Sequence, residues 1–212
     1  MKRRILIVIF LISLQTFLNI QVQATEKADN LFKPQISNTQ ILKEQAIISY
    51  KKGNYKEAIN YLAVVTCSSI DDESFILIAN SYDKLGNFKK ASDYLEKAIE
   101  VNPKNSYAYY NLAILNFNNG NIHIALNNFE RAIKNNKNFS AAHYNTGICY
   151  YKVGNYKKAL KYFHKAHKLS PNNPNVSYNL ALTYETLNNN KKAQKYYNLH
   201  NFLSESNKKN TN

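Results

Sequence analysis

The chain has 212 residues, a length that limits it to one or two domains. It carries 28 Lys and Arg against 14 Asp and Glu, which gives a formal net charge of +14 at pH 7. Asn is unusually common, so a single Asn is weak evidence for a function.

Residues 1–24 have the pattern of a secretory signal peptide. A basic segment at 2–4 precedes an apolar stretch at 5–14, and Val22-Gln23-Ala24 supplies the small residues that a signal peptidase requires. The alternative is an uncleaved membrane anchor, but the apolar stretch is shorter than the roughly 20 residues of a typical span. We predict cleavage after Ala24 and export, to the periplasm or in secreted form. N-terminal anchoring in the membrane, facing the periplasm, is the alternative.

Residues 25–38 are polar and predict a linker, whereas residues 39–203 contain a repeat. Gly-Asn dipeptides recur with spacings of 33, 34 and 34 residues, and an Asn-Asn pair continues the series: Gly53-Asn54, Gly86-Asn87, Gly120-Asn121, Gly154-Asn155 and Asn188-Asn189. A Gly directly after a helical run ends that helix in the left-handed conformation. Each repeat is therefore predicted to be helix, tight turn, helix, with boundaries at 39–71, 72–105, 106–139, 140–173 and 174–203. Residues 204–212 predict a disordered polar tail.

The repeats resemble the tetratricopeptide repeat family, whose signature is W-x2-L-G-x2-Y, then A-x3-F, then P. The second repeat has at these positions Phe75, Ile78, Ala79, Tyr82, Ala91, Leu95 and Pro103. The fourth has His143, Thr146, Gly147, Tyr150, Ala159, Phe163 and Pro171. The resemblance implies an all-α, right-handed superhelix (an α-solenoid) of about five repeats, whose stacking builds the core. It also implies that the first helix of each repeat lines a concave inner surface.

This predicted inner surface carries Tyr, Asn and aliphatic residues where a solvated face would carry Lys and Glu. Asn111, Asn145 and Asn179 recur 34 residues apart, each after a Tyr. An Asn amide can donate to a carbonyl and accept from an N–H at once, so a row of them can hold the backbone of an extended peptide. The predicted peptide-binding residues are Tyr107, Tyr110, Asn111, Ile114, Phe117, Tyr144, Asn145, Ile148, Tyr151, Tyr178 and Asn179. The alternative is that Tyr-Asn is only a repeat consensus in an Asn-rich chain.

Lysines crowd the second helices of the second and fourth repeats, with a phase that indicates the convex surface. They are Lys89, Lys90, Lys97, Lys157, Lys158, Lys161, Lys165 and Lys168. Ordinary solvation explains such a face, and the alternative is weak contact with an anionic membrane surface or glycan. Nucleic acid is not an expected partner of an exported protein.

No motif indicates catalysis, a cofactor or a metal site. His164 and His167 lie three residues apart on one expected helix, but no carboxylate or Cys in the neighbouring turns completes a metal site. Cys67 and Cys149 are expected to be buried thiols without a disulfide.

Taken together, these features predict a non-catalytic scaffold or adaptor for protein–protein interaction. It would bind an extended segment of a protein or peptide partner in its concave groove, in cell-envelope assembly. The alternative is an envelope-surface protein that binds anionic lipid or glycan through its basic convex face. The oligomeric state stays open.

Overall fold

The computed structural model describes residues 38–68 and 71–209, and the regular secondary structure of these residues is entirely helical. The predicted signal peptide, the predicted linker up to residue 37 and residues 210–212 of the predicted tail lie outside the described residues. The described residues fall into two compact units, residues 38–68 and residues 71–209. None of the described helices has both the length and the apolar character that a membrane span requires.

The N-terminal unit contains the first repeat, a hairpin of the helix at 38–51 and α2 (Tyr55–Ser68). Ala46 and Ala58 are completely buried, and Leu62 and Val65 of α2 add to this small core. Cys67 is exposed, so the prediction of a buried thiol is wrong at this position. The physical reason is helical phase: two positions after Val65, a side chain points away from the apolar stripe of α2.

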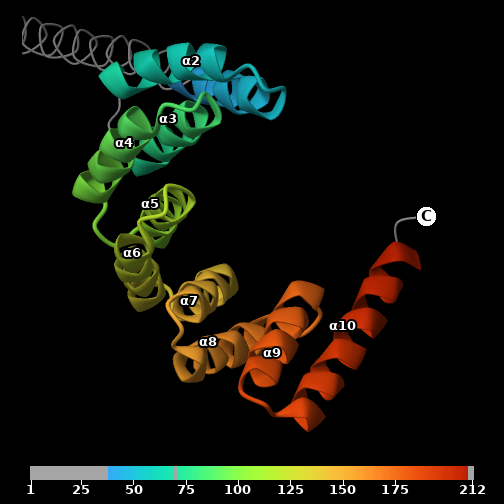
Figure 1. Cartoon of the computed structure of the whole chain (residues 1–212). Helices are drawn as coiled ribbons and strands as arrows, with labels where there is room; N and C mark the ends of the chain where they lie inside the picture. Colours follow the sequence, from blue (N-terminus) through green and yellow to red (C-terminus); the bar gives the residue numbers. More distant parts are fainter. Residues whose placement is uncertain (1–37, 69–70, 210–212) are drawn as a thin grey trace, which may run out of the picture. The chain divides into compact units, whose positions relative to one another are not determined.

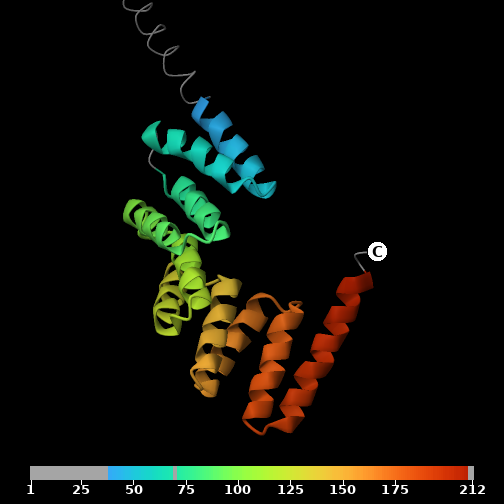
Figure 2. The ribbon, with the colours of Figure 1, turned by 45° about the horizontal axis from the view of Figure 1, so that its top comes forward.

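The C-terminal unit is a row of four helix pairs, each of which is one repeat (Figures 1 and 2). Its helices are α3 (Asp72–Lys84), α4 (Phe88–Val101), α5 (Ser106–Asn118), α6 (Ile122–Asn135), α7 (Ser140–Lys152), α8 (Tyr156–Leu169), α9 (Pro174–Thr186) and α10 (Asn190–Lys209). The second to fifth repeats are therefore α3–α4, α5–α6, α7–α8 and α9–α10. For the described residues, the prediction of an all-α solenoid of helix-turn-helix repeats is confirmed.

The Gly-Asn dipeptides make the same turn in successive repeats. In the fourth repeat Gly154 has φ +77°, a conformation that L side chains rarely adopt. Its N–H donates to the carbonyl of Tyr151 at 3.0 Å, and Asn155 N–H donates to the carbonyl of Tyr150 at 2.8 Å, which is a Schellman motif. Asn155 then caps α8, because its side chain accepts a hydrogen bond from the N–H of Lys158. One dipeptide thus ends one helix and begins the next.

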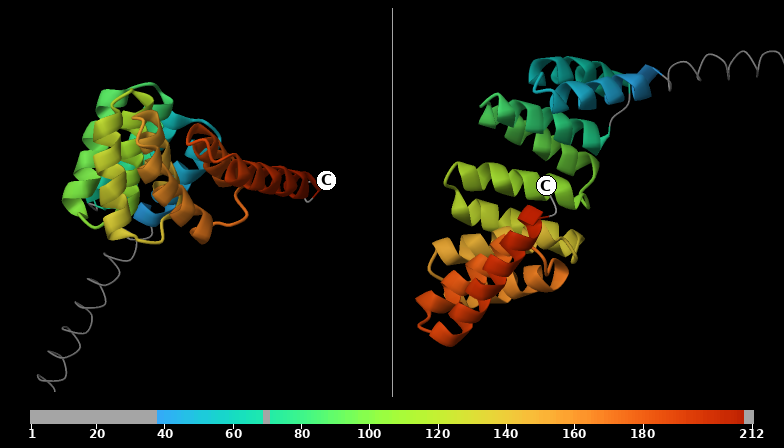
Figure 3. Two further views of the ribbon diagram at one scale, coloured as in Figure 1. Left: turned by 60° about the horizontal axis from the view of Figure 1, so that its bottom comes forward. Right: turned by 90° about the vertical axis from the view of Figure 1, so that its right-hand side faces the viewer.

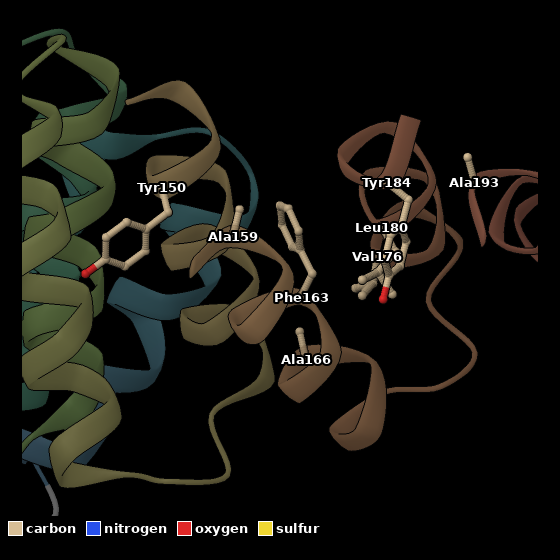
Figure 4. Packing of buried hydrophobic residues seen from close by; sticks show 8 residues of the cluster. All are labelled: Tyr150, Ala159, Phe163, Ala166, Val176, Leu180, Tyr184 and Ala193. Carbon is tan, nitrogen blue, oxygen red and sulfur yellow. The ribbon is translucent and has the colours of Figure 1, made fainter. Parts of the chain in front are cut away.

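Small residues stand where the two helices of a repeat cross, as the sequence predicts. Gly147 is the extreme case: a Cβ added there would lie 2.5 Å from Cδ1 of Phe163. Phe163 is completely buried in the cluster that α7, α8, α9 and α10 share (Figure 4). In this view its ring lies between the small side chain of Ala159 on its own helix and Leu180 of α9. Close helix crossing in the fourth repeat therefore depends on the absence of a side chain at position 147.

The last helix, α10, is 20 residues long and is drawn in red in Figure 3. It continues to Lys209, past the predicted end at residue 203, so residues 204–209 of the predicted tail are helical. Leu203 is buried at 8 % exposure and holds this part of the helix in the fold. No Gly or Pro follows Pro174 in the sequence to end the helix earlier.

Candidate functional site

The first helices of successive repeats lie along one side of the C-terminal unit. Within this unit α3 contacts α5 directly and α7 contacts α9, in addition to the contacts between consecutive helices. Figure 1 shows α5 and α7 along the inside of the curve and α6 and α8 along its outside. We call the side formed by α3, α5, α7 and α9 the inner face, and the side formed by the second helices the outer face.

The three recurrent Asn residues form a chain of hydrogen bonds between repeats on the inner face, here called the asparagine ladder. Asn145 Nδ2 donates to the hydroxyl of Tyr110 at 2.9 Å. One repeat further on, Asn179 Nδ2 donates to the hydroxyl of Tyr144 at 2.9 Å. Asn111 Nδ2 donates to Oδ1 of Asn80 at 3.1 Å. Each amide is therefore joined to the preceding repeat, a role that differs from the predicted contact with a peptide backbone.

The ladder leaves acceptors available on the inner face. The Oδ1 atoms of Asn111, Asn145 and Asn179 accept no hydrogen bond from the described part of the chain. Asn179 uses its amide N–H groups on Tyr144 and on the carbonyl of Asn175, at 2.9 Å each. The ladder can thus accept hydrogen bonds from the backbone N–H groups of a ligand. Some of its amide N–H groups already donate to other residues of the fold, so fewer donors are left for a ligand.

The ladder tyrosines are half-buried and belong to the packing of the repeats. The ring of Tyr110 lies 4.8 Å from that of Phe139 and 5.6 Å from that of Phe129, and Tyr144 lies 6.0 Å from Phe163. Burial raises the pKa of both phenols, and the hydrogen bonds from the Asn residues offset this only in part. Both side chains therefore stay protonated at neutral pH and serve as uncharged partners of the ladder amides.

Two other predicted site residues project from the inner face into solvent. Tyr107 is 58 % exposed and Tyr178 is 42 % exposed. Neighbouring rings fix both: Tyr107 lies 4.9 Å from Phe139, and Tyr178 lies 5.4 Å from His200. Exposed aromatic rings held in one orientation can take a ligand with little loss of side-chain entropy.

The remaining predicted site residues are half-buried: Ile114, Phe117, Ile148 and Tyr151. Lys152 lies over the ring of Phe117, with Nζ 5.5 Å from its centre. The hydroxyl of Tyr151 is hydrogen-bonded to Thr186 Oγ1 at 3.1 Å. These side chains contribute apolar area beside the ladder, and none of them is a strongly exposed contact like Tyr107.

Between the second and third repeats the ladder bond runs from Asn111 to Asn80 and not to a tyrosine, and a hollow opens beside it. Ile76 of α3 occupies the position that Tyr110 and Tyr144 hold in the next two repeats. The hollow, about 330 Å³ in volume, is here called the Ile76 hollow; it is lined by Glu73, Ile76, Leu77, Asn80, Asn105, Tyr107 and Asn111. Sequence reasoning missed Glu73, Ile76 and Asn105, although the loss of the Tyr-Asn pattern at Ile76-Leu77 is visible in the sequence.

The N-terminal end of α3 brings negative charge to this hollow. Asp72 and Glu73 occupy the first turn of α3, after the N-cap Asp71. Burial raises the pKa of Asp72, but hydrogen bonds from Asn105 at 2.6 Å and Asn102 at 2.7 Å outweigh it and hold this pKa below its usual value. Asp72 is therefore ionised at neutral pH and joins α3 to the loop that precedes α5.

Several outer-face lysines are part of an aromatic arrangement that recurs from repeat to repeat. Lys90, Lys158 and Lys192 lie with Nζ 5.0, 5.0 and 5.1 Å from the ring centres of three tyrosines, which are Tyr82, Tyr150 and Tyr184. Each of these rings stacks on a Tyr of the second helix, in the pairs Tyr82–Tyr94, Tyr150–Tyr162 and Tyr184–Tyr196. Cation–π contacts thus give these three lysines a structural role.

The third repeat lacks this arrangement, since Asn116, Ile124 and Asn128 stand at the corresponding positions. Its Glu130 instead accepts hydrogen bonds from both tyrosines of the fourth repeat, Tyr150 at 2.9 Å and Tyr162 at 3.3 Å. Burial, together with the neighbouring carboxylate, raises the pKa of Tyr150 to about 12. These two bonds link the third repeat to the fourth in addition to the ladder.

His164 and His167 of α8 pack at the interface between the fourth and fifth repeats. His164 Nε2 is hydrogen-bonded to the hydroxyl of Tyr184 at 2.8 Å, and both imidazoles lie edge-on against Tyr196. Among the described residues, no group of three or more His, Cys, Asp and Glu side chains is placed to hold a metal ion.

The fold and the inner face together define a helical-repeat scaffold. Tetratricopeptide repeats are matched at residues 73–105 and 140–173, at 94–127 and at 174–199, which together cover more than half of the chain. The chain therefore belongs to the tetratricopeptide repeat family, and these repeats indicate a scaffold for protein–protein interaction.

Solved structures with the same fold include two of MamA. The crystal structure of MamA superposes with a TM-score of 0.70 at 24% identity, covering 77% of this chain and 96% of that one. MamA 41-end from Desulfovibrio magneticus RS-1 superposes with a TM-score of 0.70 at 18% identity, covering 80% and 96%. At these identities the likeness concerns the fold. No curated protein matches the sequence.

Proposed function

We propose that this protein is a non-catalytic scaffold that holds an extended segment of a partner protein along the inner face of its C-terminal unit. The observation that supports the proposal most directly is the combination of exposed, ring-held Tyr107 and Tyr178 with the free Oδ1 atoms of the asparagine ladder. The rings supply apolar area, and the amide oxygens accept from peptide N–H groups without reading a sequence.

Photo-crosslinking in cells tests this proposal. A photoreactive amino acid replaces Tyr107 or Tyr178 on the inner face, and His123 or Lys157 as exposed controls on second helices. We expect the same partner to be crosslinked from both inner-face positions and not from the controls. Crosslinking of equal yield from all four positions, or from the controls alone, would contradict inner-face binding.

We further propose that the protein acts in the cell envelope, as the pattern of residues 1–24 supports. The basic segment, the apolar stretch and the small residues before position 25 are typical of an exported protein. N-terminal sequencing of the protein isolated from the periplasmic fraction should begin at Thr25. A start at Met1 in the membrane fraction would instead favour the anchored form.

A second candidate function is binding of an anionic lipid or glycan at the outer face. A hollow of about 470 Å³ on α7 and α8 supports it, because its lining includes Lys161, Lys165 and Lys168. Binding to anionic vesicles should then weaken steeply between low and physiological salt, and replacement of the three lysines by Gln should abolish it. Binding unchanged by these substitutions would exclude this site.

A further inference from the structure

The Ile76 hollow exists because one step of the asparagine ladder lacks its tyrosine. A Tyr at the equivalent position of α5 or α7 fills the space between first helices and accepts from the next Asn. Ile76 is shorter and has no acceptor, so Asn111 turns to Asn80 instead. The space that a phenol ring would occupy is left open toward the inner face.

The walls of the hollow combine aliphatic, aromatic and acidic groups. Ile76 and Leu77 provide aliphatic surface, and the exposed ring of Tyr107 stands beside them. Glu73 is exposed and forms no hydrogen bond or ion pair through its side chain with the described residues. A smaller hollow of about 50 Å³ shares Asn80 and Asn111 with the Ile76 hollow and includes Asp83 in its lining.

This lining is complementary to a side chain with an apolar stem and a cationic end. The methylene groups of Lys or Arg can pack on Ile76 and Leu77, while the charged end reaches Glu73. The face of an aromatic ring such as Tyr107 also attracts a cation. The overall charge of the chain opposes a basic ligand, but salt screens charges beyond about 10 Å at 0.1 M, so the nearby carboxylates dominate.

We propose that the Ile76 hollow anchors a Lys or Arg side chain of the extended partner segment. This inference rests on the proposed function, because it assumes that a peptide lies along the inner face. It adds a chemical requirement, one basic residue, at a defined place between the second and third repeats. A partner that places an apolar or an acidic residue there is the competing outcome.

A panel of unstructured, fluorescently labelled nonapeptides tests the anchor. The peptides share Ser and Ala flanks and differ only at the central residue, which is Lys, Arg, norleucine or Glu. Binding of the full chain is measured by fluorescence anisotropy at 0.05 and 0.15 M salt. We expect the Lys and Arg peptides to bind about five- to tenfold more tightly than the norleucine peptide, and the Glu peptide to bind most weakly.

Two substitutions of the hollow separate its charge from its shape. Glu73→Gln should lower the preference for Lys over norleucine to about twofold or less, because it removes the carboxylate, keeps the volume and leaves only the weaker attraction of the Tyr107 ring. Ile76→Tyr should fill the hollow and lower affinity for the Lys peptide about tenfold. Because Ile76→Tyr also offers a hydroxyl to Asn111, its melting temperature should not fall below that of the native chain, which excludes misfolding as the cause. Glu100→Gln, an exposed carboxylate of α4, is the matched control and should change nothing.

The outcomes distinguish this inference from the proposed function. Equal affinity for the Lys and norleucine peptides, or undiminished binding by Ile76→Tyr, would overturn the basic anchor. If Tyr107 and Tyr178 still crosslink a partner in that case, inner-face binding stands and only the anchor fails. If no peptide binds and no inner-face crosslink forms, both are overturned.

Discussion

Asn145 and Tyr110 belong to adjacent repeats, and the hydrogen bond between them shows why Asn recurs at one phase. We predict that Tyr110→Phe and Asn145→Ala each destabilise the fold and that their effects are not additive. The coupling free energy should be about 1 kcal/mol, the net worth of one such hydrogen bond. Urea unfolding of the two single variants and the double variant measures it. The control is Asn118→Ala, at an exposed Asn of α5, the helix that carries Tyr110. It should change stability by less than about 0.5 kcal/mol.

We expect the stability of the fold to depend on pH through three histidines with lowered pKa values. Burial lowers the pKa of His143, His164 and His167, and nearby positive charge lowers it further. A lowered pKa in the folded state means that the unfolded chain binds more protons, so stability is present above pH 6.5 and is lost as the pH falls below it. The free energy of unfolding should therefore decrease from pH 7.5 to pH 5. His164→Gln should flatten the curve, whereas the exposed His123→Gln should not; an unchanged curve for His164→Gln would contradict this assignment.

At the scale of the helical element, the fourth repeat depends on Gly147. Gly147→Ala should gain roughly 1 kcal/mol of helix propensity but force Phe163 out of its place, at a cost of about 1–3 kcal/mol. We expect a net destabilisation of up to about 2 kcal/mol by chemical denaturation. The second repeat pairs Ala79 with Leu95 in the same position, so Gly147→Ala/Phe163→Leu should recover part of the loss. No recovery would mean that the ring contact is not the cause.

The helices and turns were predictable because their causes are local in the sequence. Gly154 ends one helix through backbone hydrogen bonds that recur at the other Gly-Asn dipeptides. Asn155 caps the next helix, as Asn87 and Asn189 do in the second and fifth repeats. The ladder bonds were not predictable, since they depend on how closely adjacent repeats stack. The Ile76 hollow likewise depends on what is missing from α3 relative to its neighbours. Proximity between repeats, and not the pattern within one, decides the candidate site.

At the scale of the whole molecule, a solenoid must close its end, and in the C-terminal unit α10 does this. The apolar side of α9 carries Val176 and Leu180, which are completely buried, and Tyr184, which is 8 % exposed. These residues pack in the core cluster that includes Ala193 of α10. Solenoids need a terminal element with a polar outer surface for solubility, and α10 carries exposed Lys191, Lys192 and Lys195.

A truncation tests this capping role. A chain that ends at residue 189 should expose the apolar side of α9 and elute as aggregate in size-exclusion chromatography. A chain that ends at residue 206 keeps the buried Leu203 and should elute like the full chain, because residues 207–209 of α10 are exposed. Comparing the two truncated chains separates the effect of losing buried contacts from the effect of shortening the chain. If the chain ending at 189 stays soluble and elutes as a monomer, the apolar side of α9 does not need α10, and the capping role is contradicted.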